Sequence, residues 1–223
     1  MINPVLPPFQ AILLDMDGLS LDTEGTYCQA WRQSALEFGV HLDESICEDL
    51  FGRQSHDVEH IISQLLGTAY DRARFYHSAE QHWRQHLLTH GVEPMPGLIS
   101  LLNRLQTLAI PHALATNSDL GHAEECLTHA RLDGAFQVMV TRDQVRQGKP
   151  APDLFLEAAR RLGVPIQSCV VLEDSATGLE AARAAGAIAI LIQRRDRLRE
   201  RLRANAHAAY TSLDEFERLL THD

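Results

Sequence analysis

Short apolar runs that end on polar residues recur along this chain, and they constrain its fold more than any other feature. The first run, Ala11–Leu14, ends on Asp15. Further runs occupy 111–115, 136–140, 169–172 and 187–192. Such runs are typical of strands buried on both faces, as in parallel sheets. Helical patterns lie between the runs, at 97–108, 119–130, 152–162 and 177–185. The sequence therefore predicts a parallel α/β sheet with right-handed crossovers.

One region breaks this alternation, because only helical patterns occur from about Thr23 to His90. The segment that follows, 91–97, is rich in Pro and Gly and suits a hinge. We therefore predict two domains: residues 1–18 and 92–223 form a three-layer α/β core, and residues 19–91 form an all-helical cap inserted after the first strand. A cap joined by two crossings is expected to open and close as a lid.

Composition narrows the function classes and the compartment. The formal net charge is -10, and an acidic surface repels the phosphate backbone, so we expect no nucleic acid partner. No apolar segment reaches membrane-spanning length, and Met1–Phe9 lacks the regions of a secretory signal. The four cysteines show neither a CxxC pair nor zinc-site spacing, so we expect reduced thiols and a cytoplasmic protein.

Polar residues gather where the expected strands end, namely at Asp15 and Asp17, at 116–118, at Lys149 and at 173–174. In open α/β sheets, ligands bind outside the carboxyl ends of the strands, so we expect one site there. Clustered carboxylates are costly without a cation, and oxygen ligands favour Mg²⁺ over zinc. Metal, lysine and N–H donors together suit phosphoryl transfer, for which a carboxylate can serve as nucleophile.

Four segments carry a family resemblance, and they occur in the family's order: 15–24 (DMDGLSLDTE), 115–118 (ATNS), 148–153 (GKPAPD) and 172–178 (LEDSATG). Together they resemble the four motifs of the haloacid dehalogenase superfamily, in its phosphatase branch. The helical insert matches the small cap of the β-phosphoglucomutase-like subgroup. The resemblance implies a Rossmann-like core, Mg²⁺ as cofactor and a small phosphorylated metabolite as substrate, with sugar phosphates among the candidates.

The resemblance also implies roles for individual residues. Asp15 would attack phosphorus and carry an aspartyl-phosphate, and Asp17 would be the general acid and base. The implied phosphate-binding residues are Thr116, Asn117 and Lys149. The implied metal ligands are Asp15, Asp17 through its carbonyl, Asp174 and, directly or through water, Glu173. Arg53 in the cap could reach an anionic part of the substrate, or it could be a surface residue at a helix junction.

Three functions remain open at this stage. Mutases of this subgroup carry a histidine where this chain has Tyr27, which favours water as acceptor and hence a phosphatase. An intramolecular sugar phosphomutase is the closest alternative, and a non-enzymatic phosphorylatable regulator is the alternative of another class.

Three smaller features complete the sequence analysis. Ser20 is a second departure from the family pattern after Tyr27, because an aliphatic residue is usual at this position. A run of six arginines within 194–203 is interpreted as an exposed helix. The sequence does not establish the oligomeric state, and a monomer is expected.

Overall fold

A computed structural model of the chain describes residues 7–50 and 55–220. The chain divides into two compact units, which are described separately. The sheet unit comprises Met1–Leu21 and Pro94–Asp223, and the helical unit comprises Asp22–Glu93. Among the described residues, no helix combines the length and the apolar composition needed to span a membrane.

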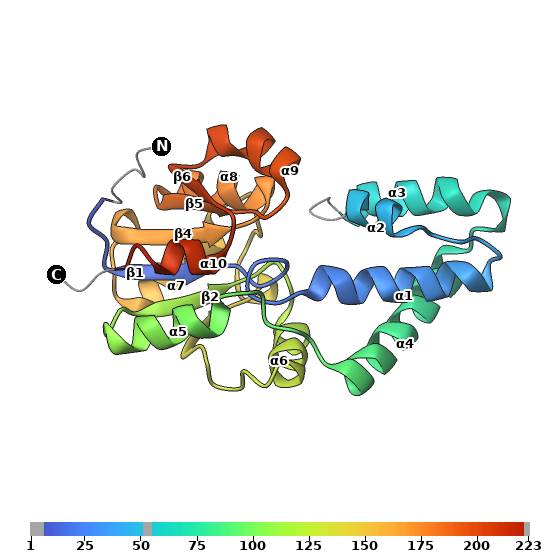
Figure 1. Cartoon of the computed structure of the whole chain (residues 1–223), viewed down its shortest axis with the longest axis horizontal. Helices are drawn as coiled ribbons and strands as arrows, with labels where there is room; N and C mark the ends of the chain where they lie inside the picture. The colour runs from blue at the N-terminus through green and yellow to red at the C-terminus, as the bar shows by residue number, and fades with distance from the viewer. Residues whose placement is uncertain (1–6, 51–54, 221–223) are drawn as a thin grey trace. The chain divides into compact units, whose positions relative to one another are not determined.

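The sheet unit is built on six parallel strands in the order β3-β2-β1-β4-β5-β6 (Figure 1). The strands are β1 Ala11–Leu14, β2 His112–Ala115, β3 Val138–Val140, β4 Cys169–Glu173, β5 Ile188–Ile192 and β6 Ala208–Tyr210. Its helices are α5 Leu98–Thr107, α6 Leu120–His129, α7 Asp153–Leu162, α8 Ala176–Ala185, α9 Asp196–Leu202 and α10 Leu213–Glu217. The predicted parallel α/β sheet is confirmed. Of the six arginines of the run, three lie on α9, whereas the other three flank it.

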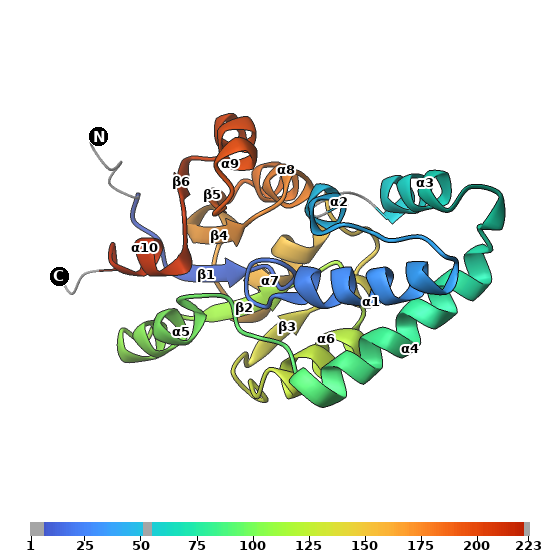
Figure 2. The same cartoon turned by 45° about the vertical axis from the view of Figure 1, so that its right-hand side comes forward.

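Helices cover both faces of this sheet. The helix α7 packs on β1, β2 and β3, and α8 packs on β4 and β5, while α5 and α10 pack together on the opposite face (Figure 2). Alternate residues of β1, Ala11 and Leu13, enter a buried cluster with Phe155 of α7 and Leu179 of α8. The central strands are buried on both sides, which accounts for their continuous apolar runs.

The helical unit contains α1 Thr23–Glu37, α2 Glu44–Leu50, α3 Ser55–Leu66 and α4 Arg72–His90. The helix α1 begins at an Asp22 N-cap, whose carboxylate accepts a hydrogen bond from the Gly25 N–H at 3.1 Å. It packs along α4, where the Trp83 indole N–H donates to the Thr26 hydroxyl at 3.0 Å. The Tyr27 ring stacks on Trp83 with ring centroids 5.5 Å apart. Within its described residues this unit contains no strand.

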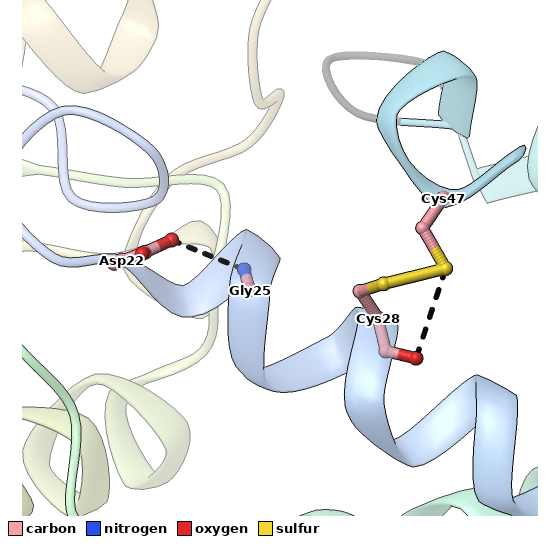
Figure 3. Close-up of a disulfide and its surroundings, with 4 residues drawn as sticks. All are labelled: Asp22, Gly25, Cys28 and Cys47. Atoms are coloured by element: carbon pink, nitrogen blue, oxygen red, sulfur yellow. Dashed lines mark hydrogen bonds between the residues drawn. A yellow bond between two sulfur atoms is a disulfide. The ribbon is translucent and has the colours of Figure 1, made fainter. Parts of the chain in front are cut away.

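Cys28 of α1 and Cys47 of α2 form a disulfide within the helical unit (Figure 3). The prediction of reduced thiols is wrong for this pair. The two Cα atoms lie 5.5 Å apart, within the range that a disulfide bridges, because the chain turns back after α1 before α2 begins (Figure 1). Cys126 and Cys169 are free and buried. The cysteines therefore do not support the prediction of a reducing compartment.

Candidate active site

Asp15 follows β1, the strand that lies between β2 and β4 in the sheet. Its backbone N–H continues the ladder by donating to the Leu172 carbonyl at 3.2 Å, and its side chain is buried. The Ser20 hydroxyl, fully buried, donates to the Asp15 backbone carbonyl at 2.5 Å. The serine that departs from the family's aliphatic residue therefore holds the main chain of the candidate nucleophile.

Asp17 lies two residues on, in a turn that Gly18 makes with a φ of 79°. Its carboxylate accepts hydrogen bonds from the hydroxyls of Thr116, at 3.1 Å, and Ser118, at 2.9 Å. The same Thr116 hydroxyl accepts from the Ser118 N–H at 3.0 Å. The loop after β2 therefore fixes the direction in which the Asp17 carboxylate points.

Lys149 brings the ends of β1, β2 and β4 together. Its ammonium donates to the Asp15 carboxylate, to the Ala115 carbonyl at 2.8 Å and to Glu173 Oε1 at 2.6 Å. Only 3% of the side chain is exposed. Burial by itself lowers the pKa of Lys149, but the carboxylates of Asp15 and Glu173 raise it above its usual range. The lysine is therefore a permanent cation at the centre of the site.

The loop that carries Lys149 is held by Asn117. The Lys149 N–H donates to Asn117 Oδ1 at 2.8 Å, and Asn117 Nδ2 donates back to the Lys149 carbonyl at 3.2 Å. A Cβ on Gly148 would collide with the Asn117 amide and with Arg142, so the close approach requires glycine. The Asn117 side chain thus orients the lysine loop, and its contact with phosphate stays a prediction.

Glu173 is the last residue of β4 and Asp174 follows it, and both are buried. Glu173 Oε2 accepts from the Ser175 hydroxyl at 2.9 Å and from the Asp174 and Ser175 N–H groups at 3.2 and 3.3 Å. Together with Asp15 these two residues offer carboxylate oxygens that lie within 4.8 Å of one another. Among the described residues this is the one such cluster.

The carboxylates of the cluster carry more negative charge than the neighbouring lysine can balance. Burial raises the pKa of Asp15 to about 8; the Lys149 ammonium opposes this rise, and the Glu173 and Asp17 carboxylates add to it. A single lysine therefore does not balance the acidic groups. Closely spaced, buried oxygen ligands with excess negative charge fit a hard divalent cation such as Mg²⁺.

The structure thus gathers Asp15, Asp17, Thr116, Asn117, Lys149, Glu173 and Asp174 at one edge of the sheet. Arg53 lies outside the described residues. Sequence reasoning missed Ser175 and Gln193, which bond to Glu173 and to the Asp174 carbonyl. Ser175 lies inside the fourth motif and Gln193 directly follows a predicted strand, so motif position and strand ends could have indicated both.

Residues 12–192 match the family model described as haloacid dehalogenase-like hydrolase. The chain belongs to this family. The predicted family membership is confirmed, and the match covers the strands β1 to β5 together with the helical unit. The family is known from the sequence match alone, independently of the geometry described above.

Curated relatives narrow the class of hydrolase. The chain is 35% identical over 182 residues to fructose-1-phosphate phosphatase YqaB of Escherichia coli (strain K12), covering 82% of this chain and 95% of that protein. It is 32% identical over 177 residues to a phosphorylated carbohydrates phosphatase of Thermotoga maritima, and the alignment covers 79% of this chain and 82% of that protein. The prediction of a hydrolase of the phosphatase type is confirmed by these relatives.

A solved structure agrees in fold. A HAD family hydrolase from Deinococcus radiodurans R1, crystallised with phosphate and sodium, superposes with a TM-score of 0.79 at 28% identity. The alignment covers 97% of this chain and 99% of that one. The similarity therefore extends over both units of the chain.

Proposed function

We propose that this chain is a Mg²⁺-dependent phosphatase that hydrolyses a small phosphorylated metabolite through an aspartyl-phosphate on Asp15. The observation that carries the proposal is the buried Asp15 carboxylate, held against the Lys149 ammonium at the meeting point of β1, β2 and β4. A buried carboxylate next to a fixed cation suits nucleophilic attack on phosphorus, because the cation offsets charge on the phosphoryl oxygens.

Asp17 is the proposed general acid and base. Hydroxyls of Thr116 and Ser118 orient its carboxylate, which is the arrangement that proton transfer to a leaving oxygen requires. After Asp15 has accepted the phosphoryl group, the ionised Asp17 would take a proton from the incoming water. We propose Lys149 as the charged partner of the phosphate oxygens, with Thr116 and Asn117 as further donors. The Thr116 hydroxyl would exchange its hydrogen bond to Asp17 for one to phosphate, and Asn117 Nδ2 carries a second proton besides the one donated to the Lys149 carbonyl.

The metal is assigned to the cluster of Asp15 and Asp174, with the Asp17 backbone carbonyl as a further ligand. Both Glu173 oxygens already accept hydrogen bonds, Oε1 from Lys149 and Oε2 from Ser175, so we link Glu173 to the ion through water. When bound, Mg²⁺ would neutralise charge on the phosphoryl oxygens and on the buried carboxylates.

The substrate class is proposed from two sources. The curated relatives named above act on fructose 1-phosphate and on phosphorylated carbohydrates, which favours a sugar phosphate here. We further propose that the helical unit acts as the cap predicted from the sequence and selects the substrate, with Arg53 as a candidate for an anionic group. Tyr27, stacked on Trp83, cannot serve as the histidine of the mutases does, so water is the proposed acceptor.

The test is phosphate release from a panel of sugar phosphates, with and without Mg²⁺, for the wild type, Asp15→Asn and Asp133→Asn. Asp133 accepts a hydrogen bond from Thr128 on the surface, so its variant controls for loss of an aspartate elsewhere. We expect Mg²⁺-dependent turnover in the wild type and the control, and none in Asp15→Asn.

Three outcomes would contradict the proposal. Near-wild-type turnover by Asp15→Asn would remove Asp15 as nucleophile. Interconversion of sugar phosphate isomers with a bisphosphate activator and no net phosphate release would assign the chain as a mutase. A stable phosphorylated chain that turns over no substrate would assign it as a regulator.

A further inference from the structure

Gln193 directly follows β5 at the carboxyl edge of the sheet, and it is 6% exposed. All four of its polar groups have partners. Its N–H donates to the Tyr210 carbonyl at 2.9 Å, and its carbonyl accepts from Arg199 Nη1 at 3.0 Å. Its side-chain Oε1 accepts from the Arg195 N–H at 3.1 Å, and Nε2 donates to the Asp174 carbonyl at 3.2 Å. The residue thus ties β6 and α9 to the end of β4.

The contact with Asp174 falls on a peptide that is held from both edges. Its carbonyl accepts from Gln193, and its N–H, which belongs to Ser175, donates to Glu173 Oε2 at 3.3 Å. Because a peptide is planar, two contacts on opposite edges fix the orientation of its plane. The Cα of Asp174 lies at one corner of that plane, so the contacts also limit where the Asp174 carboxylate can point.

We propose that Gln193 is a positioning residue for the metal site: its amide holds the Asp174 main chain so that the Asp174 carboxylate faces Asp15. This inference rests on the proposed metal-dependent function. Partners of this kind, one step removed from a metal ligand, set ligand direction and strongly affect metal affinity.

The proposal also gives a role to Arg199, one of the arginines of the run. Arg199 on α9 pairs with Asp196 and donates to the Gln193 carbonyl, so α9 anchors the main chain from which the amide extends. This contact fixes the backbone of Gln193, whereas the contact with Asp174 uses its side chain. Variants of the two residues can therefore separate anchoring of the loop from positioning of the ligand.

The test compares Gln193→Met with Arg199→Met. Methionine preserves the length and volume of the side chain but cannot donate to the Asp174 carbonyl. Each protein is stripped with EDTA and titrated with Mn²⁺, with free ion followed by electron paramagnetic resonance; thermal unfolding shows that each variant is folded. We expect the Mn²⁺ dissociation constant to rise by about 10- to 100-fold in Gln193→Met. In Arg199→Met we expect a smaller rise, because the amide contact with Asp174 and the bond from the Gln193 N–H to Tyr210 remain.

The Mg²⁺ dependence of turnover gives a second readout. For Gln193→Met we expect a higher Mg²⁺ concentration at half-maximal rate, with kcat recovered at saturating Mg²⁺. Should Gln193→Met fail to fold, Gln193→Asn replaces it, because asparagine retains the amide but is one methylene too short to reach Asp174. The same rise in dissociation constant is expected.

Two outcomes would overturn the inference, and they differ from each other. A wild type that binds neither Mn²⁺ nor Mg²⁺ would remove the metal-dependent function and this inference with it. A wild type that binds Mn²⁺, with Gln193 variants that bind it equally well and only unfold at lower temperature, would reduce Gln193 to a structural residue and leave the proposed function standing.

Discussion

For Gly178→Ala, general helix propensity and this structure predict opposite changes in the free energy of unfolding. Gly178 lies in the first turn of α8, where alanine would stabilise an ordinary helix by about 0.5–1 kcal/mol. A Cβ at this position, however, would overlap the Glu173 carboxylate. The outcome depends on whether Glu173 can move away.

Contacts of Glu173 oppose that movement. The side chain is fully buried, and its oxygens accept from Lys149 at 2.6 Å, from the Ser175 hydroxyl at 2.9 Å and from two backbone N–H groups. Displacing the carboxylate breaks at least one hydrogen bond to a charged group, which costs about 1.5–3 kcal/mol. After the propensity gain is subtracted, we expect a net destabilisation of about 0.5–2.5 kcal/mol, together with loss of turnover as Lys149 loses its partner.

Urea unfolding followed by circular dichroism measures the first effect, and phosphate release measures the second. Gly121→Ala is the matched control, because a Cβ there meets only Asp119 Oδ1, at 3.6 Å, which is ordinary van der Waals contact. In the first turn of α6 that variant should be stabilised by up to about 1 kcal/mol and remain active. If Gly178→Ala were as stable as Gly121→Ala, the close packing of Glu173 against α8 would be refuted.

Three further predictions concern stability. Reduction of the Cys28–Cys47 disulfide should lower the free energy of unfolding of the helical unit by about 3 kcal/mol, as estimated for a loop of this size; superimposable urea curves with and without dithiothreitol would contradict this. Ser20→Ala removes the hydroxyl that donates to the Asp15 carbonyl and should cost about 1–3 kcal/mol in urea unfolding, whereas an unchanged midpoint would show that water replaces the hydroxyl. Hydrogen bonds from two arginines lower the pKa of Glu157 from 4.5 to about 2, so this carboxylate stabilises the fold above pH 4.5 and less as the pH falls towards 2. On this exposed surface, Glu157→Gln should therefore cost at most about 1 kcal/mol at pH 7 and less at pH 3, and an equal loss at both values would refute the pKa shift.

The sheet was largely predictable because each central strand is buried on both faces and therefore reads as a continuous apolar run. The edge strand β6, Ala208–Tyr210, was not predicted, since three residues of which two are alanine give little signal. At the opposite edge β3 begins at Val138, two residues later than predicted, as expected where a strand has a partner on one side only. Burial of a strand, rather than its length, determined how well the sequence revealed it.

Within the site, the sequence placed side chains correctly at strand ends but could not show what each one touches. Asn117 illustrates this limit, because motif position implied a phosphate ligand but gave no sign that the amide also bonds to the Lys149 main chain. Contacts between loops separated by 32 residues depend on the register of the whole sheet, which a motif does not encode.

The disulfide and Gln193 extend this point to residues outside any motif. Cys28 and Cys47 are 19 residues apart, and the turn of the chain between α1 and α2 brings them within bonding range (Figure 1). Gln193 meets Asp174 because β4 and β5 are neighbours in register, with Glu173 opposite Leu191. A glutamine two residues beyond Leu191 can then reach the carbonyl one residue beyond Glu173. Supporting residues of this kind become predictable once the order of the strands is known. Residues that directly follow a central strand should therefore be substituted and assayed together with the motif residues.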